Sequence, residues 1–188
     1  MTPRTILTIT YFALLAGVAS IANAQHSTPP APQLTFDDQM VERELAALNA
    51  PIKSNQDLND YLAAQQVTPL DKFSATARQD FLDSLVFGEK GLASFRYDLL
   101  EKELTPTDIY SLLSLFGLQG GTAQLDGAQA KTSLDRAILQ MNDQQYANSF
   151  DGFGGGFPGT SDDFLEGYKC DSPGSCVLAD GYACTSNC

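Results

Sequence analysis

The chain has 188 residues, with 23 acidic against 11 basic side chains and a formal net charge of −12. This charge repels nucleic acids and anionic bilayers, which argues against both as partners. The single histidine, His26, lies near the N-terminus and cannot supply the positioned imidazole of a Ser- or Cys-based hydrolase. The sequence also has no phosphate-binding loop and no typical set of metal ligands, so we expect neither a cofactor nor a metal.

Residues 1–24 have the pattern of a cleaved signal peptide. Arg4 precedes a mostly apolar run from Ile6 to Ile21, and Ala22-Asn23-Ala24 is an A-x-A cleavage site. We therefore expect a periplasmic or secreted protein with no membrane span after cleavage. Residues 25–34 are rich in proline and are expected to form an extended leader.

Residues 35–147 predict an all-α domain, a small bundle of about five or six helices. The first helix is expected to begin at Thr35 and to end near Leu48, and a second begins at Ser54. The inner side of the first helix is expected to hold four apolar residues: Phe36, Met40, Leu45 and Leu48.

Further helices are expected after two Thr-Pro-x-Asp motifs, at Thr68 and Thr105. One helix should run from about Ser74 to Phe87, and the stretch 92–104 should be helical in its second half, with residues 92–95 either helical or extended. The segment from Thr105 to Gly117 is the best defined, with a single apolar stripe: Ile109, Leu112, Leu113 and Phe116. A last helix is expected over 133–146, with Leu134, Ile138 and Met141 on its apolar side.

The composition changes after this domain. Residues 148–167 are rich in Gly and Phe and are expected either to be a flexible linker or to fold back onto the core. Residues 168–188 are expected to form a disulfide-bonded C-terminal knob that contains every cysteine of the chain: Cys170, Cys176, Cys184 and Cys188. Four cysteines allow three connectivities, and the sequence does not choose among them. Their spacing lacks the C-x2-C pairs of structural zinc sites.

The leading functional hypothesis is an exported, non-enzymatic protein that binds an unknown protein or peptide partner. Its expected binding surface is Tyr168, Leu178 and Tyr182, which the disulfides would hold at low entropic cost. The first alternative is a secreted precursor whose helices carry a Cys-rich C-terminal peptide; residues 118–121 (Leu-Gln-Gly-Gly) are similar to the double-glycine end of exported peptide leaders. The second alternative is a carboxylate-based hydrolase that uses one of four acidic pairs: Asp37/Asp38, Glu42/Glu44, Glu101/Glu103 or Asp162/Asp163.

Overall fold

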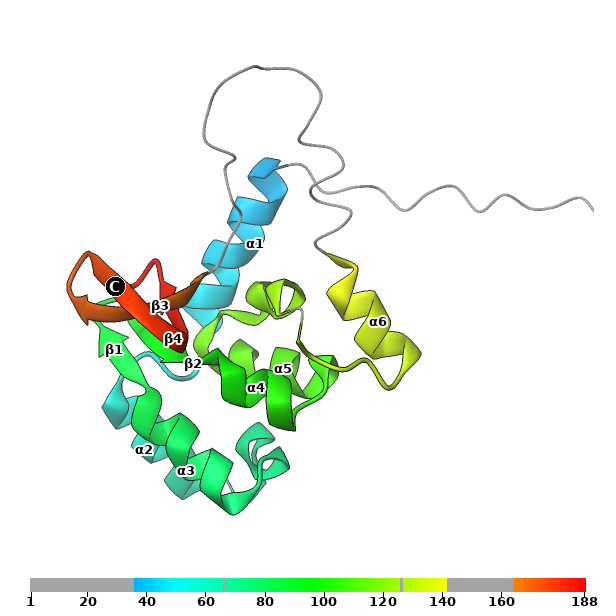
Figure 1. The fold of residues 1–188 in the computed structure, drawn as a ribbon. Helices are drawn as coiled ribbons and strands as arrows, with labels where there is room; N and C mark the ends of the chain where they lie inside the picture. The colour runs from blue at the N-terminus through cyan, green and yellow to red at the C-terminus, as the bar shows by residue number, and fades with distance from the viewer. Residues whose placement is uncertain (1–35, 66, 126, 142–163) are drawn as a thin grey trace, which may run out of the picture. The chain divides into compact units, whose positions relative to one another are not determined.

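The computed structural model describes residues 36–65, 67–125, 127–141 and 164–188, with side chains described from residue 41 onward (Figure 1). The predicted signal peptide, the leader and residues 148–163 of the Gly/Phe-rich segment lie outside these residues. The expected all-α bundle is wrong, because the described residues combine helices with a four-stranded antiparallel sheet.

The helices alternate with short 3-10 turns in the order α1 (Phe36–Asn49), α2 (Asn55–Ala64), η1 (Pro69–Lys72), α3 (Ala75–Ser84), α4 (Tyr97–Glu103), α5 (Pro106–Leu113), η2 (Ser114–Phe116), η3 (Gln119–Gln124) and α6 (Ser133–Leu139). Four helices begin after a hydroxyl side chain that accepts the backbone N–H three residues later: Ser54, Ser74, Thr105 and Thr132. Such caps satisfy donors that the first helical turn leaves unpaired. The predicted starts of α2, α3 and α5 are confirmed.

Helix α5 lies in the core and follows the prediction closely. Pro106 takes the first helical position after Thr105, and Ile109, Leu112 and Leu113 are fully buried. The helix continues through η2 to Gly117, whose φ of 74° is left-handed and ends the helix. Local sequence therefore sets both ends of this element.

The sheet consists of β1 (Val86–Gly88), β2 (Gly91–Arg96), β3 (Phe164–Ser172) and β4 (Ser175–Thr185), in the spatial order β1-β2-β4-β3. The C-terminal strand β4 lies between β3 and the much earlier strand β2, where Phe95 is the partner of Ala183. The predicted helix over 74–87 therefore ends early, at Ser84, and the extended alternative for residues 92–95 is the one adopted.

The C-terminal strands share the main core instead of forming a separate knob, which corrects that prediction. The ring of Phe164 in β3 lies 5.3 Å from that of Phe95 in β2, edge to face. A Cβ added to Gly121 in η3 would overlap the Phe164 ring, so this glycine allows the close approach. The largest fully buried apolar side chains come from helices, from β2 and from two connecting segments: Ile52, Leu70, Phe81, Leu92, Phe95, Leu100, Ile109, Leu112, Leu113 and Leu125.

Two predictions of inward-facing residues are wrong. Leu45 and Leu48 of α1 are at least half exposed. Of the three apolar residues predicted for the last helix, only Ile138 is buried, whereas Leu134 and Met141 are exposed. Both helices have apolar residues at helical spacing, but the rest of the domain buries only some of these side chains.

Candidate functional site

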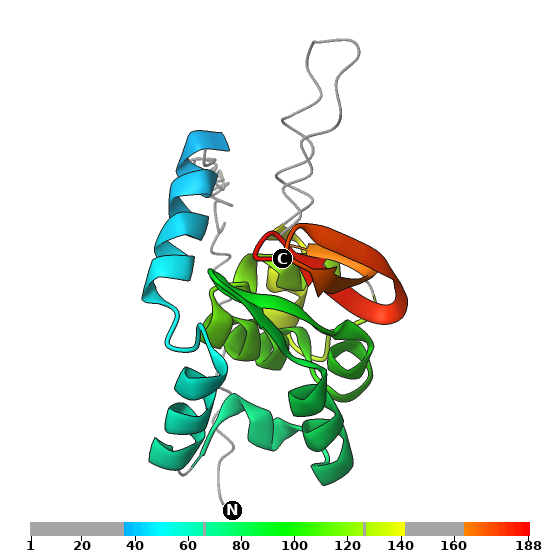
Figure 2. The ribbon, with the colours of Figure 1, turned by 90° about the vertical axis from the view of Figure 1, so that its left-hand side faces the viewer.

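The hairpin of β3 and β4 carries the residues that the sequence analysis singled out as a binding surface (Figures 1 and 2). Glu166 is paired with Ala183, whereas the next pair, Tyr168 with Leu178, leaves several residues of β4 bulged between them. Gly167 and Gly181 at this bulge have φ values of 77° and 75°, a left-handed conformation that glycine adopts without strain. The bulge separates an inner part of the hairpin, paired with the sheet, from an outer part.

An ion pair supports the bulge from the helical side. The guanidinium of Arg96, at the end of β2, donates to both carboxylate oxygens of Asp98 in α4. A Cβ added to Gly181 would lie 2.9 Å from the carboxylate carbon of Asp98, so Gly181 packs directly on this pair. The outer hairpin is thus anchored to the body at its base.

Two disulfides cross-link the outer hairpin, as the even cysteine count predicted. Cys170 of β3 is bonded to Cys188 at the C-terminus, and Cys176 is bonded to Cys184 across the bulge of β4. The structure thereby selects one of the three connectivities. The sulfur atoms of Cys170, Cys184 and Cys188 lie within 4.8 Å of one another, but all are in disulfides, which leaves no thiolate for a metal.

The structure brings two of the three predicted surface residues together. Tyr168 and Leu178 are directly opposite each other across the strands and therefore project to the same face. Leu178 is 81% exposed, while Tyr168 also packs against the buried cysteine cluster. This pair combines a rigidly held ring with an apolar side chain almost wholly in water.

Tyr182 is placed differently from the other two residues. It is the partner of Arg96 in the sheet, and the ammonium of Lys169 lies 4.9 Å from the centre of its ring. Lys169 is in turn opposite Val177, which is 43% exposed. Sequence reasoning missed Lys169 and Val177. Residues 168–171 alternate as a strand does, but Val177 and Leu178 are both apolar and give no such signal.

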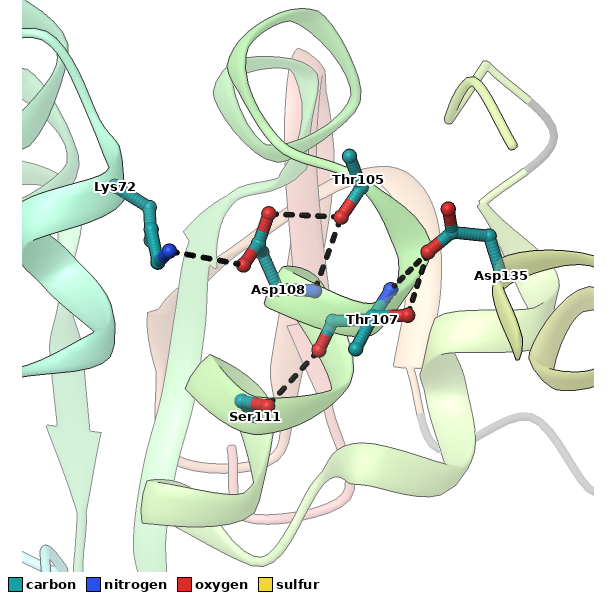
Figure 3. Close-up of polar contacts among 6 residues, drawn as sticks. All are labelled: Lys72, Thr105, Thr107, Asp108, Ser111 and Asp135. Atoms are coloured by element: carbon teal, nitrogen blue, oxygen red, sulfur yellow. Dashed lines mark hydrogen bonds and ion pairs between the residues drawn. The ribbon is translucent and has the colours of Figure 1, made fainter. Parts of the chain in front are cut away.

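A second polar cluster joins the starts of α5 and α6 around Asp135 (Figure 3). One carboxylate oxygen of Asp135 accepts from the amide and hydroxyl of Thr107, at 3.0 and 2.5 Å. The other oxygen accepts from the amides of Lys131 and Thr132, at 3.0 and 2.8 Å. These hydrogen bonds, above all the one from the Thr107 hydroxyl, lower the pKa of Asp135 although burial raises it.

The geometry around Asp135 is that of a structural clamp. A carboxylate has about four acceptor positions, and all of those of Asp135 are in use. The group is therefore held ionised and has no free lone pair with which to take a proton from a substrate. The signal for this cap, Thr132 followed three residues later by an acid, is present in the sequence, and α6 begins at Ser133 as predicted.

The neighbouring carboxylate, Asp108, caps α5. It accepts from the Thr105 hydroxyl at 2.7 Å, and its other oxygen lies 3.9 Å from the ammonium of Lys72 (Figure 3). Because Lys72 is mostly exposed, this ion pair adds little stability. Asp108 thus serves the same capping role as Asp57 and Asp71 at earlier helix starts.

The acidic pairs proposed for hydrolysis are not brought together at one site where their side chains are described. Glu101 accepts the amide of Gly127 at 2.8 Å, whereas Glu103 accepts the amide of Ser74 at 3.3 Å. Glu42 and Glu44 are exposed on α1. The side chains of residues 37, 38, 162 and 163 lie outside the described part of the chain.

No model of a known protein family, no curated protein and no solved structure matches this chain. Of the helices that the structure describes, none has both the length and the apolar character needed to cross a bilayer.

Proposed function

We propose that this chain is an exported, non-enzymatic binding protein that engages a protein or peptide through the outer part of the β3–β4 hairpin. One observation carries the proposal: Leu178, 81% exposed, lies on a hairpin that two disulfides cross-link. A large apolar side chain in water is available for burial by a partner. Cross-linking reduces the conformational entropy that binding would otherwise cost.

The charge around the hairpin indicates what kind of partner fits. Two exposed acids lie close in sequence to the Tyr168–Leu178 pair: Asp171 follows Tyr168, and Asp180 follows Leu178. The whole chain carries a net charge of −12. A partner with an apolar pocket and basic side chains at its rim would be steered toward this surface. We therefore propose a basic protein or peptide as the partner, in the periplasm or the medium.

The sheet pairing favours a function of the whole chain over release of a C-terminal peptide. Strand β4 lies between β2 and β3, and Ala183 and Cys184 are buried there. Removal of residues 170–188 would expose the core that these residues cover. The hydrolase alternative has less support, because Glu101 and Glu103 of one proposed pair accept backbone amides of two different segments.

The experiment is photo-crosslinking of the exported chain in the cells that produce it. A photoreactive amino acid at position 178 should give a discrete adduct, whereas the same residue at exposed Asn59 in α2 should not. Pairwise replacement of Cys176 and Cys184 by Ser should weaken the adduct, because the hairpin then loses a cross-link. Equal adducts at positions 178 and 59, or none at 178, would refute the proposed surface.

The intact mass of the exported protein tests the precursor alternative. We expect one species that begins at Gln25 and that gains, on reduction, only the hydrogens of two disulfides. A short fragment ending at Cys188 would instead make the helices a carrier and would count against the proposal.

A further inference from the structure

A second apolar surface lies on α1, far in sequence from the hairpin. Val41, Leu45 and Leu48 are spaced at i, i+4 and i+7, and their side chains are 54%, 50% and 70% exposed. At about 100° per residue this spacing places the three side chains on one side of the helix. They form an unbroken apolar stripe, which we call the α1 stripe.

The way α1 is seated explains why this stripe faces outward. A Cβ added to Gly117 would lie 2.7 Å from the Ala47 Cα and 2.9 Å from the Ala46 carbonyl oxygen, so the helix backbone rests on the glycine that ends η2. At about 100° per residue, Ala46 and Ala47 lie about 130° from the centre of the α1 stripe on opposite sides, so the point midway between them is opposite the stripe. The helix thus rests on η2 through its backbone at Ala46 and Ala47, and its stripe faces away from this contact.

Further contacts hold the C-terminal end of α1. The Lys53 ammonium donates to the Leu48 carbonyl at 2.7 Å, and the Ile52 amide donates to the Leu115 carbonyl at 3.0 Å. In both ribbon views α1 meets the other described elements at this end (Figures 1 and 2). An isolated helix of 14 residues is marginal in water, so a partner that covers the stripe would stabilise the rest of the helix.

The charges beside the stripe indicate the chemistry of its occupant. Glu42 and Glu44 are exposed and flank the stripe on opposite sides. Apolar residues at i, i+4 and i+7 are the anchors of helix recognition. Basic side chains beside the apolar stripe of a partner helix would pair with these two acids.

We propose that the α1 stripe docks a cationic amphipathic helix of a partner protein. A second copy of the chain is a poorer occupant, because each copy carries a net charge of −12 and the two would repel each other. The proposal does not rest on the function assigned to the hairpin, since the residues that carry it are different.

The test measures binding of a synthetic helical peptide by fluorescence anisotropy, with the exported full-length protein. The probe is a peptide of about 20 residues with a leucine stripe flanked by lysines, a length at which a helix forms readily. A scrambled peptide of the same composition is the first control. A version with glutamate in place of lysine is the second, and it should bind weakly.

Matched variants locate the binding. The pair Leu45→Ser and Leu48→Ser should weaken binding of the lysine peptide about tenfold for each leucine. Leu178→Ser, at an even more exposed apolar residue on the hairpin, should leave this binding unchanged. The pair Glu42→Lys and Glu44→Lys should reverse the preference, so that the glutamate peptide binds better than the lysine peptide. All of these positions are exposed, so the variants should unfold at nearly the wild-type temperature.

Three results would overturn the proposal. The scrambled peptide could bind as well as the designed one, or the serine pair in α1 could leave binding unchanged. Sedimentation equilibrium could also reveal a dimer that the same serine pair abolishes, which would identify a second copy as the occupant. None of these results affects the hairpin, because the photo-crosslink at position 178 is measured separately.

Discussion

Removal of either disulfide should lower the stability of the core and not only loosen the tail. Strand β4 carries Cys184 and, one residue earlier, Ala183, which is fully buried and is the partner of Phe95 in β2. A cross-link that constrains β4 therefore acts on a strand that the main core needs. The perturbations are the two double variants that remove one whole bond each, Cys170→Ser with Cys188→Ser and Cys176→Ser with Cys184→Ser.

The lengths of the two closed loops set the magnitude. The bonds span 18 and 8 residues, which correspond to about 3.2 and about 2.5 kcal/mol of lost unfolded-state entropy. The loops are nested, so with the inner bond intact the outer bond closes only about ten further links, and its contribution falls to about 2.7 kcal/mol. We therefore expect the two variants to be destabilised by similar amounts, with Tm lower by about 5–10 °C.

The assay is urea unfolding followed by far-UV circular dichroism, together with amide hydrogen exchange. If the core is shared, each variant unfolds in one transition, and the amides of Ala183 in β4 and Leu112 in α5 show the same free energy of opening. The double variants retain no unpaired thiol from the broken bond, so disulfide exchange does not confuse the result. A two-step transition in which Ala183 opens first, with α5 as stable as in the wild type, would refute the shared core.

Two further substitutions test the packing of the body. Asp135→Asn should destabilise the protein and speed exchange of the Thr107 amide. Because the pKa of Asp135 is lowered in the folded state, the stability that its carboxylate adds is complete above the unfolded-state pKa of about 3.9 and is lost as the pH falls through the lower folded-state pKa. Urea unfolding of the wild type and the variant should therefore converge in strong acid. Gly121→Ala should cost about 1–3 kcal/mol, because its Cβ meets the Phe164 ring, while Gly120→Ala at an exposed position should be nearly neutral in the same unfolding assay.

The helix starts could be predicted because their signals are local. Ser54, Thr68, Thr105 and Thr132 each precede an acid by three residues, and each pair forms its hydrogen bonds within a single turn. No distant residue is needed to satisfy these groups. The same reasoning gives the end of α5, because Gly117 needs only its own freedom to turn left-handed.

The sheet could not be predicted in the same way because its pairing is distant. The Ser94 hydroxyl donates to the Ala183 carbonyl, 89 residues later, and β2 is buried on both faces from Gly91 to Phe95. A strand buried on both faces has no alternation of apolar and polar residues to reveal it. In the tail, Gly167 and Gly181 interrupt the alternation at the bulge, which hides the hairpin from the same test.

The candidate site was predictable in its composition but not in its geometry. The even cysteine count indicated two disulfides, yet their connectivity depends on the register that places Tyr168 opposite Leu178. The outward orientation of Leu45 could not be predicted either, because it depends on the packing of the α1 backbone against Gly117. The first fact depends on the register of a bulged hairpin, and the second on a contact between α1 and η2, which lie far apart in the sequence.

The two proposed surfaces differ in how they are connected to the core. Leu178 lies on β4, which is also a core strand, so a partner bound to the hairpin stabilises the folded state of the whole core and raises its Tm. The α1 stripe lies on a separate helix, whose C-terminal end contacts the body. A partner bound there mainly orders α1, so protection of α1 amides should rise more than the Tm of the core. The two kinds of binding can thus be told apart without knowing either partner.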